Sequence, residues 1–100
     1  MLDQLTVESF EPHVGSSFWV VFDNGHKVEL RLESVGRVME SEAARLQRTA
    51  FSLFFLGPKS IRLPQQTYTI AHDSFPEPLG IFLVPVGQEA RGFIYEAVFT

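Results

Sequence analysis

The segments that decide the fold read Phe51-Ser-Leu-Phe-Phe-Leu-Gly-Pro58, Gln65-Gln-Thr-Tyr-Thr-Ile-Ala-His72, Ile81-Phe-Leu-Val-Pro-Val-Gly87 and Ile94-Tyr-Glu-Ala-Val-Phe99. They are rich in β-branched and aromatic residues, and Gly, Pro and polar residues separate them. We therefore predict four strands, at Thr49–Leu56, Gln65–Ala71, Ile81–Val86 and Phe93–Phe99. The first is apolar on both faces, which predicts a central strand. Pro85 lacks the donor of a strand ladder, so its strand needs an edge position or a bulge.

Two further strands are predicted in the first half of the chain. Ser17–Phe22 and His26–Glu33 flank a turn at Asp23–His26, where Asn-Gly tolerates positive φ. In the second strand, apolar and charged residues alternate, which predicts one buried and one solvated face. Gly36 is expected to end this strand, and residues 36–49 are predicted to be a mobile loop or a short surface helix.

A short helical turn is predicted at the N-terminal end. Thr6–Phe10 begins at a capping threonine, and Pro12 and Gly15 follow soon after. Its apolar residues would cover one end of the core. With six predicted strands, the fold class is mainly β, a small antiparallel barrel or sandwich with a short N-terminal helical turn. Ten phenylalanines need to be buried, which favours a closed or strongly curled barrel over an open sheet.

Length and composition indicate one domain spanning residues 1–100 and exclude several classes of protein. The chain has no cysteine, which excludes disulfide scaffolds and thiolate chemistry. The net charge is −4 and the eight basic residues are scattered, so we expect no nucleic-acid binding. The first residues do not resemble a secretory signal, and no apolar run approaches the length of a membrane span. We therefore expect a cytoplasmic protein with no membrane association.

The second half of the chain resembles a bacterial family of small domains of unknown function. Family members carry the motifs Phe-x-Leu-x-Phe-x-Gly-Pro, Leu-x-Gln-x-x-Tyr-x-x-x-His, Phe-Leu-Val-Pro-Val-Gly and Tyr-Glu-Ala-Val-Phe. Here these motifs stand in the same order at Phe51–Pro58, Leu63–His72, Phe82–Gly87 and Tyr95–Phe99. The resemblance implies no assigned activity. The members look like neighbours of phage-tail-like and tail-collar proteins, which implies an accessory or structural part.

Four polar residues form the only candidate cluster for a ligand or for a structural polar network: Arg62, Tyr68, His72 and Glu96. His72 follows a strand whose alternate residues are predicted to face the core, so a hydrogen bond to Glu96 or to the backbone would satisfy it. His13, His26 and His72 lack metal-ligand spacing, and no serine lies in a nucleophile elbow. We therefore predict no catalytic, cofactor or metal residues and no cofactor.

The sequence favours a non-enzymatic interaction or assembly module with protein partners or self-association. Trp19 and the Ile81–Val86 strand are candidate contact surfaces, the latter by strand pairing if it lies at a sheet edge. The alternative is a small-ligand-binding β-barrel, or an enzyme, with its site at a barrel mouth near His72, Tyr68 and Arg62. A deep polar pocket around His72 would favour this alternative, whereas a flat apolar patch would favour assembly.

Overall fold

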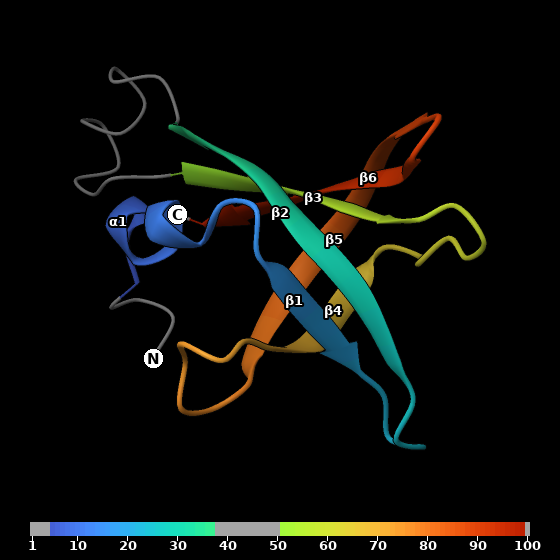
Figure 1. Ribbon diagram of the computed structural model, residues 1–100, viewed down its shortest axis with the longest axis horizontal. Helices are drawn as coiled ribbons and strands as arrows, with labels where there is room; N and C mark the ends of the chain where they lie inside the picture. Colours follow the sequence, from blue (N-terminus) through green and yellow to red (C-terminus); the bar gives the residue numbers. More distant parts are fainter. Residues whose placement is uncertain (1–4, 38–50, 100) are drawn as a thin grey trace.

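The computed structural model describes residues 5–37 and 51–99, and six strands in it form a closed antiparallel barrel (Figure 1). The strands are β1 (Ser17–Val21), β2 (Lys27–Arg37), β3 (Phe51–Pro58), β4 (Gln66–Ala71), β5 (Leu79–Glu89) and β6 (Gly92–Phe99). The short helix α1 (Val7–Phe10) and the 3₁₀ turn η2 (Glu11–His13) precede them. The structure confirms the mainly β prediction and, of its two forms, the barrel.

Pairing of the first strand with the fourth closes the sheet. The strand order is β1-β2-β3-β6-β5-β4, and β4 returns to β1 through the pairs Trp19↔Ala71, Val20↔Ile70 and Val21↔Thr69. Every strand therefore has a hydrogen-bonded neighbour on both sides, and the predicted central position of β3 is confirmed between β2 and β6. The alternative edge position for β5 is wrong, because β4 and β6 flank it.

The interior is filled by side chains from all six strands. Alternate residues of β3 show the pattern, since Phe51, Leu53 and Phe55 are almost fully buried. Tyr95 of β6 is also fully buried, and its hydroxyl oxygen accepts a hydrogen bond of 2.8 Å from the N–H of Leu63. A six-stranded barrel has room for side chains in its interior, and large aromatic rings suit that space.

The helical segment covers one end of the barrel, which we call the helix end (Figure 1). Thr6 precedes α1 in an extended conformation, and its N–H donates to Ser9 Oγ at 3.2 Å. Phe10 is fully buried, and its ring lies 5.5–6.5 Å from four other phenylalanine rings. These rings are Phe18, Phe51, Phe75 and Phe99. The predicted helical turn and its position over the core are thus confirmed.

Three predicted strand boundaries are wrong, each because pairing continues past a Gly or Pro. Gly36 does not end β2, since it pairs with Ser52. Gly57-Pro58 continues β3 opposite β6 instead of turning the chain. β5 extends to Glu89, and its register shifts between Pro85 and Gly87, so the predicted bulge is confirmed. The predicted loop or helix at residues 36–49 otherwise lies outside the described residues.

The predicted hairpin between β1 and β2 is present with a three-residue loop, Asp23–Gly25. The N–H of Phe22 donates to the carbonyl of His26 at 2.9 Å, and the N–H of Gly25 donates back to the carbonyl of Phe22 at 2.9 Å. Gly25 has φ +87°, the left-handed conformation that closes such loops. The side-chain oxygen of Asn24 accepts from the N–H of His26, which further fixes the turn.

Gly92 allows β3 and β6 to approach closely where β6 begins. It has φ +154°, and a Cβ atom at this position would lie 1.9 Å from the carbonyl oxygen of Gly57. Because the obstructing atom belongs to the backbone of a paired strand, no side-chain rotation can relieve the contact. The residue therefore has to be glycine for the strands to pair in the observed register.

We expect Gly92→Ala to destabilise the domain by about 3–5 kcal/mol, since it combines an unfavourable φ with backbone overlap. Gly80→Ala is the matched control, because a Cβ there would meet only a Thr67 methyl carbon at 3.8 Å. Urea unfolding followed by tryptophan fluorescence measures both. A Gly92→Ala midpoint equal to that of Gly80→Ala would show that the close approach at Gly57 is absent.

Candidate functional site

His72 lies at the helix end of the barrel, immediately after β4. Its ring centroid is 4.2 Å from that of Phe18 and 4.6 Å from that of His13. Phe75 lies 5.8 Å from each of the two imidazoles. We call His13, Ser16, Phe18, His72 and Phe75 the histidine cluster. It joins η2, the start of β1 and the loop after β4, three segments that are distant in the sequence.

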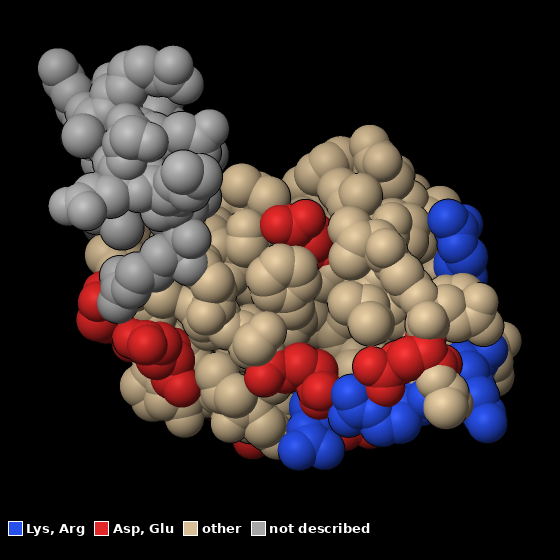
Figure 2. Space-filling view, turned by 90° about the horizontal axis from the view of Figure 1, so that it is seen from above, with Lys and Arg blue, Asp and Glu red and all other residues tan. Residues whose placement is uncertain are grey.

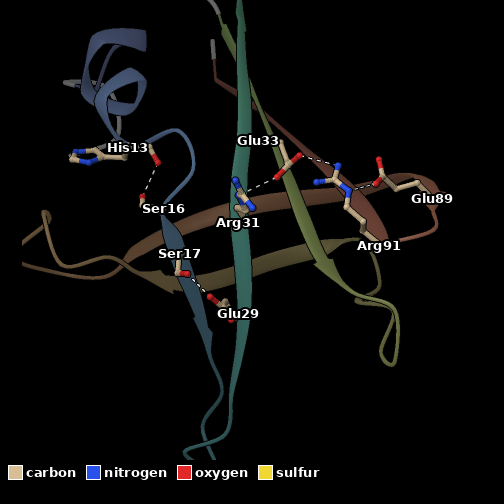
Figure 3. Close-up of polar contacts among 8 residues, drawn as sticks. All are labelled: His13, Ser16, Ser17, Glu29, Arg31, Glu33, Glu89 and Arg91. Atoms are coloured by element: carbon tan, nitrogen blue, oxygen red, sulfur yellow. Dashed lines mark hydrogen bonds and ion pairs between the residues drawn. The ribbon is translucent and has the colours of Figure 1, made fainter.

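The hydrogen bonds of the histidine cluster assign the proton positions. The N–H of Ser74 donates to His72 Nδ1 at 3.0 Å, so Nδ1 carries no proton. The hydroxyl of Ser16 donates to the carbonyl of His13 at 2.6 Å, a contact drawn in Figure 3. Ser16 Oγ also lies 2.8 Å from His72 Nε2. Since the serine proton is directed elsewhere, His72 Nε2–H is the donor in this contact, and the imidazole is neutral.

This proton arrangement does not match a nucleophile–base pair, although the Ser16–His72 distance does. A catalytic histidine accepts the serine proton at Nε2 while its Nδ1–H donates to an orienting carboxylate. Here Nδ1 accepts from a backbone N–H and Nε2 is protonated. As arranged, the cluster links the N-terminal segment to the loop after β4, and His72 cannot withdraw a proton from Ser16.

The surroundings of His72 also favour its neutral form. Burial lowers the pKa of His72 below its ordinary value of 6.5, His13 lowers it further, and Asp73 partly opposes both effects. The hydrogen bond from Ser74 acts in the same direction as burial, because a proton on Nδ1 would displace it.

The structure does not bring the four predicted polar residues together. His72 lies at the helix end, whereas Tyr68 is buried towards the opposite end, where its hydroxyl donates to the carbonyl of Pro64 at 2.5 Å. Arg62 is exposed in the segment before β4. Glu96 lies on the outer face of β6 and accepts a hydrogen bond of 3.0 Å from Ser52, so its partner is not His72. Sequence reasoning missed Ser16 and His13, because only barrel closure places them beside His72.

A surface depression of about 320 Å³ adjoins His72 on the outer side of β1 and β4. Trp19, 39% exposed, forms one wall, and Lys27 and Asp73 contribute opposite charges.

Within residues 5–37 and 51–99, no group of three or more His, Cys, Asp or Glu side chains is placed to hold a metal ion. The described residues also include no helix long and apolar enough to cross a membrane.

The outer surface of the barrel differs sharply between two sides. On one side, which we call the charged side, β2 meets the β5–β6 turn: Arg91 pairs with Glu33 at 2.9 Å and also with Glu89, and Arg31 pairs with Glu33 at 3.3 Å (Figure 3). Ser17 donates to Glu29 nearby. Figure 2 shows charged side chains gathered along one edge of the molecule, beside a broad surface with few of them.

The outward side of β3, β6 and β5 is apolar, and we call it the apolar outer face. Phe82 and Val98 are 49% and 56% exposed and line one shallow depression of about 270 Å³ with Thr67. The face comprises Phe54, Phe82, Val84, Ile94 and Val98, with Glu96 among them. Outward positions of an antiparallel strand that faces water are normally polar, so this face departs from the usual pattern.

Comparison with known proteins gives a family without an assigned activity. A family model described as a domain of unknown function (DUF6916) matches residues 5–99. No curated protein and no solved structure matches the chain. The match supports the predicted resemblance to small domains of unknown function, and the family's description specifies no ligand, partner or reaction.

We expect the stability of the protein to fall as the pH drops below 6.5, partly through His72. Its pKa is lowered in the folded state, so the unfolded chain binds the proton more readily, and stability present above pH 6.5 is lost as the pH falls through the lower folded value. Urea midpoints between pH 7.5 and 5 measure this loss.

His72→Gln should reduce this pH dependence, since glutamine does not titrate. His26→Gln is the matched control, because His26 is exposed in the hairpin turn. If His72→Gln and His26→Gln retain the pH dependence of the parent protein equally, the neutral assignment of His72 is wrong.

Proposed function

We propose that this chain, which belongs to the DUF6916 family of domains of unknown function, is a non-enzymatic protein-binding module that contacts its partner through the apolar outer face. The exposure of Phe82 and Val98 on that face is the observation that carries the proposal. Contiguous exposed apolar side chains on a small domain mark interaction sites, because water contact with them is unfavourable.

The barrel architecture also supports this proposal. Its interior is occupied by buried side chains, including Phe18, Phe55 and Tyr95, which leaves the outer surface for recognition. Each strand has a hydrogen-bonded neighbour on both sides, so only parts of strands, such as the end of β5, are open to an added strand. We therefore favour side-chain contacts on an outer face as the means of binding.

A small-ligand site or an enzyme near His72 is the second candidate function. The depression lined by Trp19, Lys27, His72 and Asp73 favours it, since an aromatic surface beside both charges suits a small polar ligand. The proton positions at Ser16 and His72 oppose acyl-transfer chemistry there. Tyr68 and Arg62, which this hypothesis required near His72, lie towards the other end.

The resemblance to a family whose members look like neighbours of phage-tail-like and tail-collar proteins suggests a finer version of the proposal. In that version the module is an accessory of a phage-tail-like assembly and acts in the cytoplasm. Support for this version comes from the sequence motifs between Phe51 and Phe99.

We expect the double variant Phe82→Ser/Val98→Ser to fold normally but to bind its partner at least tenfold more weakly, because central apolar contacts dominate binding energies. Ile61→Ser is the control, since Ile61 is 42% exposed but lies in the segment after β3. Proteins that co-purify with the tagged domain from its native cells are identified by mass spectrometry, purified and titrated calorimetrically.

Equal affinity of the double variant and Ile61→Ser for such a partner contradicts the proposal. Loss of partner binding in Trp19→Ala, with the double variant unaffected, would move the protein contact from the apolar outer face to the depression beside His72.

A further inference from the structure

Glu96 is a carboxylate surrounded by apolar side chains at the centre of the apolar outer face. Phe54 of β3 and Val84 of β5 are its direct neighbours across the sheet. Ile94 and Val98 flank it on the same face of β6, since side chains two residues apart on a strand point to the same side. All four nearest positions on this face are therefore apolar.

The carboxylate of Glu96 has few partners for its charge. Ser52 donates one hydrogen bond of 3.0 Å to Oε2, and no cation pairs with Glu96 among the described residues. An ionised carboxylate has about four acceptor positions. By contrast, Glu33 and Glu89 on the charged side each pair with Arg91. Glu96 thus retains acceptor capacity directed outward from an apolar surface.

We infer that the apolar outer face binds a peptide segment of a protein partner in which one arginine or lysine, flanked by apolar residues, pairs with Glu96. This inference rests on the proposed function and adds the chemistry of the partner. A segment that covers Glu96 needs a basic residue opposite the carboxylate. Without that basic residue, binding would bury an unpaired negative charge, which is unfavourable.

Arginine suits this position better than lysine. Its guanidinium is planar, is weakly hydrated and can donate two parallel hydrogen bonds to one carboxylate. It can also stack on an aromatic ring, and Phe54 is the direct neighbour of Glu96. Apolar residues on both sides of the arginine would exclude water from the ion pair and contact Val84 and Val98.

The test is a selection of random peptides displayed on phage against the purified full-length domain. We expect enriched peptides to share one basic residue between apolar residues. Against Glu96→Gln the basic residue should lose its enrichment while the apolar residues remain, and Glu96→Lys should select an acidic residue at the same place. Glu29→Gln is the matched control, because Glu29 also accepts a hydrogen bond from a serine but lies on the charged side.

Calorimetry then quantifies the ion pair. An enriched peptide should bind Glu96→Gln about tenfold more weakly than the parent or Glu29→Gln, and replacing its arginine by the neutral citrulline should weaken binding to the parent similarly. Glutamine retains an acceptor for Ser52, so this variant tests charge with the local fold preserved. Thermal melting of each variant confirms folding before titration.

Three results would overturn the inference. Selection of apolar peptides with no preference for a basic residue would overturn the inference, but it would agree with the proposed function. Selection of the same peptides by Phe82→Ser/Val98→Ser would reject the proposed function as well. Light scattering that shows a dimer, converted by the double variant to a monomer, would identify a second copy of the chain as the occupant of the face.

Discussion

Pairing of β1 with β4 is the contact on which the rest of the structure depends. It converts a twisted sheet into a barrel and gives both strands a second hydrogen-bonded neighbour. Closure creates an interior that must be filled from all sides, which explains the use of Phe18, Phe55 and Tyr95 there. It also pairs each strand on both sides over part of its length, which is why the proposed contact uses side chains on an outer face.

Closure also determines the surroundings of His72. By placing the start of β1 beside the end of β4, it brings Ser16 and Phe18 against an imidazole more than fifty positions later in the chain. The N-terminal turn adds His13 and Phe10 to the same end. The resulting cluster fixes a neutral histidine by hydrogen bonds of defined direction, and these bonds fasten the helical segment over the core.

The sequence predicted the strands well where one local pattern was sufficient. Alternation in β2 and the Asn24-Gly25 turn identified the first hairpin, and the apolar faces of β3 identified a central strand. The ends of strands were predicted less well, because pairing with a neighbour carries β3 through Gly57-Pro58 and β5 through Gly87 to Glu89. The candidate site depended most on long-range contacts: the pairing of Ser16 with His72 and of Ser52 with Glu96 follows from register, which no local pattern in the sequence specifies.

The closed barrel has a consequence for the order in which the chain folds. The β1–β2 and β5–β6 hairpins join residues that are close in sequence, so they can form early. The β1–β4 contact joins segments about fifty residues apart, and such distant pairings slow folding because the loop between them must close first. Until that contact forms, the chain exposes one unpaired edge of β1 and one of β4, and these two edges fit each other. At high concentration, β1 of one molecule can therefore pair with β4 of another, and exchange of strands between copies is the misassembly route that this topology favours.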